Sequence, residues 1–391
     1  MEPITHALAS VALGRAGLDR VTRFAMPMLI VSGVAADLDW LSYLFGPRAF
    51  LAAHRTASHS LVGTAAIAVA TTALFFWFAW FAARRNRLSA SPGGPFSTKS
   101  PLADRVEPFQ FWPALMICGA AAGLHLLLDL TDSYGAKLLW PFSAKWYAGD
   151  LAAEIDPWII VLLLAAVFFS LLFGLITQEI GAHAPTRTGN RAAVAALFFL
   201  PLYLGGRAVF HQRALALLSS RLYRGETPLR SAAFPGWSPF DWKGLVDTGD
   251  AFEGVDVPVY QARGFDPERT RRLLKPPESR AIDAARVSAA SQAFLAFARF
   301  PLATQQEIPG GYRIEIRDLR FAAVHEGFEW APTASMARNM AGEMAADSIA
   351  STRQAARFGE VVAVITTNAN FEVTSATLDF ASSGAPAQGA H

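Results

Sequence analysis

The sequence predicts an α-helical polytopic membrane domain followed by a smaller, water-facing α+β domain. Of the 391 residues, 52% are hydrophobic, which is high for a soluble chain of this length. Long apolar runs occur only before residue 215, and proline, glycine and charge become frequent after it. We therefore expect a multi-helix transmembrane domain at residues 1–215, an extramembrane domain at residues 216–381 and a disordered tail at residues 382–391.

Composition excludes several classes of protein. The net charge of +2 is nearly balanced, so no global field favours nucleic acid, and we expect no nucleic-acid partner. The single cysteine, Cys118, excludes an internal disulfide framework and a thiolate zinc cluster. Residues 1–14 lack a basic start and include Glu2, so we do not expect a cleaved signal peptide.

Four apolar runs are long enough to cross a bilayer. About 20 helical residues, rising about 1.5 Å each, span a hydrocarbon core of about 30 Å. The clearest run stops at a basic cluster that begins at Arg84, and the last one contains Pro201, where we expect a kink. The predicted spans are residues 57–83, 111–130, 158–176 and 192–210.

The first forty residues allow two interpretations. Residues 4–18 and 24–36 are each too short for an ordinary span, and a charged stretch at residues 19–23 separates them. Either the second piece alone crosses the bilayer, extended to residue 45, or the two pieces form a tight helical hairpin. We favour the hairpin because it brings His6 near Asp37.

Basic residues predict the orientation. Arginine and lysine concentrate around residues 15–23, 84–105 and 187–191, and such loops are usually cytoplasmic. The loops at residues 46–56 and 131–157 then face outward. By the same count of spans, the C-terminal domain is also external.

Pattern also predicts elements in the C-terminal domain. Alternation of apolar and polar residues indicates strands at residues 312–316 and 361–366. Residues 267–274 and 336–357 are typical of helices. An α+β module is the simplest architecture that contains both.

Ionisable residues cluster in or beside the predicted spans. Each costs on the order of 3 kcal/mol in a membrane helix, so each needs a reason. Asp37 and Asp39 are two residues apart and would point about 200° apart on an α-helix. A helix end or turn is therefore needed to aim both carboxylates at one point.

Histidines supply the other half of this cluster. His54 and His59 flank the start of the clearest span, and His125 and Asp129 are i and i+4, on one face of a helix. All of these groups fall on the outer side in the predicted topology. The competing explanations are that each histidine bonds a backbone carbonyl, that the aspartates cap helices, or that the groups relay protons.

Imidazole and carboxylate together suit a divalent metal, with zinc preferred and manganese or iron as alternatives. Water beside such an ion can reach a pKa near 7 and act as a nucleophile. In this hypothesis His54, His59, His125 and Asp129 hold the metal, and Asp37 or Asp39 either completes the ligand shell or acts as a base.

Several short blocks resemble one known family. They are Thr5-His6, Ala36-Asp37-Leu38-Asp39, His54-Arg55-Thr56-Ala57-Ser58-His59-Ser60, His125-Leu126-Leu127-Leu128-Asp129, Tyr134-Gly135 and Leu139-Trp140-Pro141. Their order and spacing are similar to those of the YdjM-like family of membrane-bound metal-dependent hydrolases, and of its longer, YfhP-like members. The resemblance covers residues 1–142, with Ala36 where the family has proline.

The resemblance implies a divalent-metal hydrolase in the bacterial inner membrane. The shared polar positions correspond to His6, Asp37, Asp39, His54, His59, His125 and Asp129. We assign Asp37 to the base and the remaining six to the metal. Arg55, beside the ligands, is a candidate to hold a phosphate or carboxylate. Asp156 and Asp150 are reserve candidates.

We therefore predict hydrolysis of an ester or phosphoester at the lipid bilayer, with a lipid-derived molecule as a candidate substrate. A transporter or proton relay would use the same polar cluster, and inverted repeats, which we do not find, would favour it. A membrane sensor or scaffold would instead hold a structural metal in a closed site.

Overall fold

The computed structural model describes residues 1–89, 109–179, 187–261, 264–325 and 360–380. The chain divides into two compact units. Met1–Asp39 and Arg55–Arg207 form the membrane unit. Trp40–His54 and Ala208–His391 form the C-terminal unit, so a short N-terminal segment belongs with the second half of the chain.

Helices dominate the N-terminal region. In chain order they are α1 (Pro3–Arg15), η1 (Leu18–Arg20), α2 (Ala25–Val34), the 3₁₀ helix η2 (Ala35–Phe45), α3 (Pro47–Ala53), α4 (Leu61–Ser89), α5 (Phe111–Asp129), α6 (Pro157–Glu179) and α7 (Arg187–Ser219). By length and composition, the described residues contain four candidate membrane spans: Ala25–Phe45, Leu61–Arg85, Phe111–Asp129 and Arg191–Ser219. The predicted helical membrane region is confirmed.

Two of the predicted spans differ in detail. The clearest run begins its helix at Leu61 rather than at residue 57, because the Ser60 hydroxyl accepts a hydrogen bond from the Gly63 backbone N–H at 2.9 Å and ends the preceding turn. Because α4 begins only at Leu61, His59 lies in a turn instead of on a regular helix. The apolar described part of α6, Pro157–Phe173, is shorter than the four candidate spans.

The first two helices combine features of both interpretations. α1 packs against α2 after the chain reverses near η1, as the hairpin requires. The candidate span Ala25–Phe45 also continues α2 into η2, as the alternative requires. The hairpin places His6 beside the start of η2.

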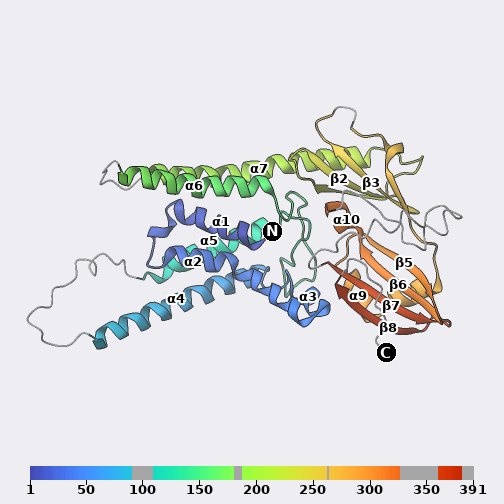
Figure 1. Cartoon of the computed structure of the whole chain (residues 1–391), viewed down its shortest axis with the longest axis horizontal. Helices are drawn as coiled ribbons and strands as arrows, with labels where there is room; N and C mark the ends of the chain where they lie inside the picture. Colours follow the sequence, from blue (N-terminus) through green and yellow to red (C-terminus); the bar gives the residue numbers. More distant parts are fainter. Residues whose placement is uncertain (90–108, 180–186, 262–263, 326–359, 381–391) are drawn as a thin grey trace, which may run out of the picture. The chain divides into compact units, whose positions relative to one another are not determined.

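Helix α5 contacts α1, α2 and α4, as Figure 1 lets the reader follow. Its buried face is rich in small residues, which let membrane helices approach closely. Gly33 on α2 shows how close: a Cβ at this position would lie 1.9 Å from the Ser10 hydroxyl of α1. Any larger residue at position 33 would therefore have to displace the Ser10 side chain.

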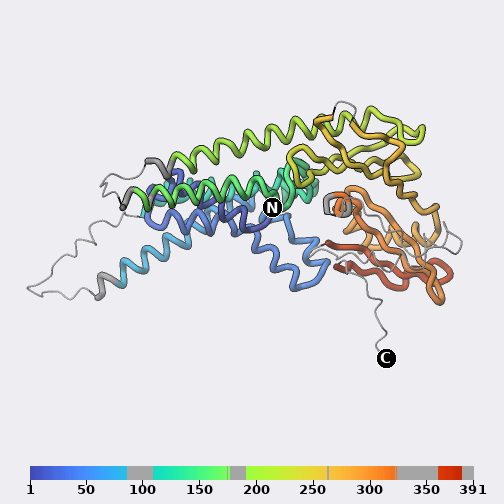
Figure 2. The backbone as a smooth tube through the Cα atoms, turned by 45° about the horizontal axis from the view of Figure 1, so that its top comes forward, coloured from blue at the N-terminus to red at the C-terminus, as the bar shows by residue number. Residues whose placement is uncertain are grey.

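The C-terminal unit contains two four-stranded antiparallel sheets, in each of which spatial order follows chain order. Figure 2 traces the backbone through both. The first sheet consists of β1 (Arg230–Pro235), β2 (Asp241–Asp247), β3 (Ala251–Pro258) and β4 (Arg271–Leu274). The second consists of β5 (Pro301–Ile308), β6 (Gly311–Asp318), β7 (Val361–Asn368) and β8 (Val373–Phe380). Short helices accompany them: η4 (Pro267–Arg269), α8 (Arg280–Arg286), α9 (Ala289–Leu295) and α10 (Leu319–His325).

Residues of the first sheet belong to two apolar clusters. Leu218 near the end of α7 and Tyr223 pack with Trp242 of the first sheet, and all three are buried. A second cluster joins Phe234 of the first sheet to Phe300 and neighbouring apolar residues. The predicted α+β character of this region is confirmed.

Sequence pattern predicted the C-terminal elements unevenly. The strands expected at residues 312–316 and 361–366 lie in β6 and β7. The helix expected at residues 267–274 is wrong: only η4 is helical, and β4 follows it because its backbone pairs with β3. The helix expected at residues 336–357 and the tail at residues 382–391 lie outside the described residues.

Candidate metal centre

The 3₁₀ winding of η2 brings the side-chain directions of Asp37 and Asp39 closer together than an α-helix would. On an α-helix the rotation of about 200° leaves the two side chains about 160° apart, measured the shorter way. With about three residues per turn, the separation on a 3₁₀ helix falls to about 120°. Both aspartates lie within Ala35–Phe45. The tighter winding therefore lets Asp37 and Asp39 approach the same histidines from neighbouring directions.

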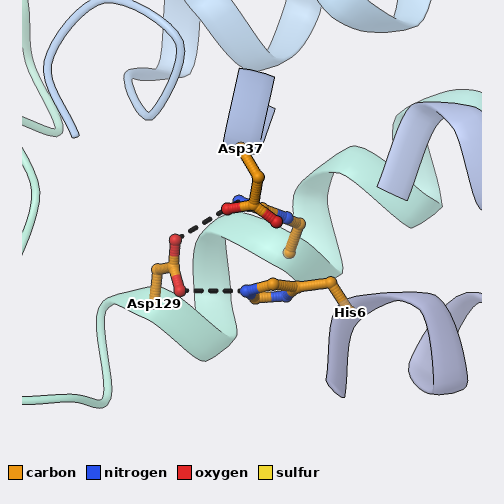
Figure 3. Close-up of side chains that lie close together, drawn as sticks. His6, Asp37 and Asp129 are labelled. Carbon is orange, nitrogen blue, oxygen red and sulfur yellow. Dashed lines mark hydrogen bonds and ion pairs between the residues drawn. The ribbon is translucent and has the colours of Figure 1, made fainter. Parts of the chain in front are cut away.

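Four buried side chains form what we call the metal group: His6, Asp37, His125 and Asp129. One donor atom from each lies within 4.8 Å of all the others. Figure 3 shows the ring of His6 and the carboxylate of Asp37 directed toward Asp129. The side chains come from α1, η2 and α5, so three segments distant in sequence build one site.

The two histidines of the metal group are held in fixed orientations. His125 Nδ1 lies 2.8 Å from the Gly33 carbonyl oxygen, which can only accept a hydrogen bond. The proton is therefore on Nδ1, and Nε2, 3.2 Å from Asp129 Oδ2, faces the group. His6 Nε2 lies 3.1 Å from Asp129 Oδ1, and its ring stacks on His125 with centroids 3.7 Å apart.

His59 lies at the edge of the metal group and is oriented by Asp39. Its Nε2 is 2.9 Å from Asp129 Oδ2 and 3.1 Å from His125 Nε2, whereas its Nδ1 is 3.0 Å from Asp39 Oδ2. The same Asp39 oxygen accepts hydrogen bonds from the Arg55 backbone N–H and the Ser58 hydroxyl, each at 2.8 Å. A carboxylate behind a histidine is a common support for metal sites.

Arg55 places a permanent positive charge against this cluster. Its φ of 53° is left-handed, a conformation that directs its backbone N–H to Asp39. Its guanidinium is buried, donates to Asp132 Oδ2 at 2.6 Å and lies 3.5 Å from Asp129 Oδ1. Burial alone lowers the pKa of Arg55, but the charges of Asp129 and Asp132 raise it above its ordinary value.

Asp132 is the residue that sequence reasoning missed. It is buried and accepts hydrogen bonds from the backbone N–H groups of Tyr134 and Gly135 at 3.0 and 3.1 Å, in addition to its contact with Arg55. The Met1 ammonium also contacts Asp132, at 2.8 Å, and Asp129. The available signal was a second aspartate three positions after Asp129.

Other predicted candidates lie elsewhere. His54 is buried against Phe50, with ring centroids 4.6 Å apart, and belongs to the C-terminal unit. Asp156 accepts hydrogen bonds from the first turn of α6 and, at 3.0 Å, from the Tyr203 hydroxyl. Asp150 is buried, and its backbone N–H donates to the backbone carbonyl of Asp132. None of these three is among the four residues of the metal group.

The metal group has the donor set that a divalent ion needs. Among the described residues, the buried oxygen Asp37 Oδ2 has no hydrogen-bond partner, and Asp129 Oδ2 is approached by the Nε2 atoms of His59 and His125 at 2.9 and 3.2 Å. A buried carboxylate oxygen without a donor is costly, and coordination of a cation would offset that cost. Two imidazoles with two carboxylates match zinc, manganese or iron.

Comparisons with known proteins place the chain in a family. The profile described as "YdjM inner membrane protein" matches residues 1–214. The uncharacterized protein YfhP of Bacillus subtilis (strain 168) is 25% identical over 175 residues, which is 43% of this chain and 45% of that relative. No solved structure gives a significant match. Because the profile covers more than half of the chain, the protein belongs to the YdjM inner membrane protein family.

Proposed function

We propose that the protein is a membrane-embedded, metal-dependent hydrolase that acts on an ester or phosphoester, with a lipid-derived molecule as the substrate class. One observation carries the proposal: two imidazoles and two carboxylates from distant segments meet inside a membrane domain. Placing ionisable groups there costs on the order of 3 kcal/mol each, so a chemical role for them is the simplest explanation.

In this proposal the metal group holds the ion: His6, Asp37, His125 and Asp129. When bound, a divalent ion supplies Lewis acidity and brings the pKa of water toward about 7, which makes a nucleophile available. We favour zinc, with manganese and iron as alternatives, because histidine and carboxylate serve all three.

Asp39 and His59 take a supporting part. Asp39 holds the Nδ1 proton of His59, so that His59 Nε2 stays directed at the metal group and can bind the ion or hold a proton. This changes the roles that sequence suggested for the two aspartates. Asp37 becomes a ligand instead of the base, because it lies within the metal group, and Asp39 supports His59 instead of binding the metal, because it is occupied by three donors.

Arg55 balances charge in this proposal. Its guanidinium is buried and paired with Asp132, which argues against its being available to hold a substrate phosphate. Its positive charge offsets the repulsion between Asp129 and Asp132, whose carboxylates would otherwise face each other in a medium of low polarity.

A second function has support from one feature of the metal group. Its four donors are buried, with Asp129 at 0% and Asp37 at 8% exposure, and four protein ligands without an open position are typical of structural metals. A sensor or scaffold would then use the ion for stability. Turnover of ester or phosphoester substrates separates the two functions, since only the hydrolase requires it.

The first test is the metal content of the purified full chain. We expect about one divalent ion per wild-type chain by elemental mass spectrometry, and at least about tenfold less in His125→Ala, which removes a ligand atom outright. His54→Phe is the matched control: it removes another buried imidazole but preserves the aromatic stack with Phe50. Equal metal in His125→Ala and the wild type would contradict the proposal.

A second prediction concerns the orientation of the chain. We propose that the C-terminal unit lies outside the cytoplasm, on the basis of the basic loops. Reporter fusions after Arg87 and Arg187 should then read cytoplasmic, and a fusion after Tyr223 should read external. A cytoplasmic signal after Tyr223 would change the number of spans by one and move the metal group to the inner face.

A further inference from the structure

Residues 40–54 connect two residues that lie beside the metal group, Asp39 and Arg55. Asp39 precedes this segment and Arg55 follows it, and the Arg55 backbone N–H donates to Asp39 Oδ2 at 2.8 Å. His59 Nδ1 lies 3.0 Å from the same oxygen. Both ends of the segment are therefore tied to the carboxylate that orients His59.

The body of the segment packs within the C-terminal unit. Tyr43 stacks on Phe380 of β8 with ring centroids 4.1 Å apart, and Phe50 of α3 meets the same ring edge-on at 5.8 Å. Trp40 and His54 pack on Phe50 from within the segment, at 5.4 and 4.6 Å. We call these five rings, four from the segment and one from the last described strand, the aromatic clasp.

Through the clasp, strand β8 contacts residues that lie only a few positions from Asp39 in the sequence. Phe380 is more than 300 positions from Asp39, yet only a few residues separate Asp39 from Tyr43, which Phe380 contacts. Asp39 and Tyr43 belong to the same helix, η2 (Ala35–Phe45). A displacement of Tyr43 can therefore reach Asp39 through one continuous, regular element, which is how coupling travels in proteins. Strand β8 can thus bias the geometry of Asp39 and Arg55.

We infer that the C-terminal domain regulates the metal centre through the aromatic clasp. When β8 holds the clasp, Asp39 and Arg55 are kept where they orient His59. When the clasp is released, the bond between the Arg55 backbone and Asp39 loosens, and the affinity of the centre for its ion falls. The expected change in affinity for the ion rests on the proposed function. The expected effect of the clasp on the contact between Asp39 and Arg55 does not.

The test uses the full chain in detergent with the variant Phe380→Ala. Hydrogen–deuterium exchange should become faster in peptides covering residues 40–54 and also in those covering residues 55–60. The affinity for added Zn²⁺ should fall about tenfold, within the usual range for coupled sites. Tyr43→Ala removes the same stack from the other side, leaves the sheet untouched and should give the same result.

Phe371→Ala is the matched control. Phe371 belongs to the same β-hairpin, but its ring stacks on Tyr312 at 5.6 Å and is not part of the clasp. Exchange at residues 40–60 and Zn²⁺ affinity should both stay at wild-type values. A fall in affinity as large as in Phe380→Ala would mean that any damage to the sheet acts on the centre, and would overturn the specific role of the clasp.

Two further outcomes would also overturn the inference. Exchange could rise only at residues 40–54 in both clasp variants, with residues 55–60 and Zn²⁺ affinity unchanged, which would mean packing without coupling. Alternatively, neither variant could alter exchange anywhere. If the wild type binds no Zn²⁺, the proposed function fails, and exchange at residues 55–60 alone still decides whether the clasp acts on the centre.

Discussion

Asp129→Asn should abolish metal binding and hydrolysis together. Asp129 is the hub of the metal group: Oδ1 lies 3.1 Å from His6, and Oδ2 lies 2.9 Å from His59 and 3.2 Å from His125. A neutral amide is a poor ligand for a borderline cation, and it also leaves the buried charge of Arg55 with less compensation. Metal content and turnover of the purified variant measure both losses.

Asp156→Asn is the control for this prediction. Asp156 is also a buried aspartate in the membrane unit, but it caps α6 and binds the Tyr203 hydroxyl instead of joining the metal group. We expect it to lose about 1 kcal/mol of stability, the usual value of a helix cap, and to keep its metal. Should Asp129→Asn retain metal and full activity, Asp129 would be a structural residue and the enzyme proposal would fail.

Asp37→Asn and Asp39→Asn should give opposite phenotypes. Asp37 belongs to the metal group, so its amide variant should lose metal. Asp39 contacts His59 Nδ1 and two donors of the following loop, so its amide variant should bind the ion about tenfold more weakly but keep most of it at saturating metal. We expect kcat of Asp39→Asn to fall roughly 10- to 100-fold with little change in KM, because a supporting carboxylate orients a histidine without touching substrate.

The opposite phenotypes would make Asp37 the general base and Asp39 a metal ligand. If Asp37→Asn keeps its metal and loses about 10²- to 10⁴-fold in turnover, Asp37 is a general base, as the sequence first suggested. If Asp39→Asn then loses metal, Asp39 is a ligand. Parallel measurements of metal content and turnover on the two variants therefore assign both carboxylates.

Much of the fold follows from local pattern. Apolar runs about 20 residues long produced the candidate spans, since a helix satisfies its backbone hydrogen bonds within one segment, as lipid requires. The i and i+4 spacing placed His125 and Asp129 on one face of α5, because helix geometry alone decides that relation. Alternation likewise located β6 and β7.

Local pattern failed where pairing decides structure. Residues 271–274 were expected to be helical, but they pair with β3, and the Arg272 guanidinium lies 3.5 Å from the buried Glu253 carboxylate across the two strands. A strand partner supplies hydrogen bonds that a short helix would have made internally. No local periodicity records which partner the chain will meet.

The sequence by itself determined that histidines and aspartates gather in a helical membrane domain, because ionisable residues in apolar runs are rare and each is visible as a letter. Only the tertiary structure decided which of them meet. It placed His6 in the metal group, put His54 in an aromatic clasp and added Asp132 beside Arg55. The reason is that donor atoms must converge within a few ångströms, and that depends on how α1, η2 and α5 pack, which spacing along the chain does not specify.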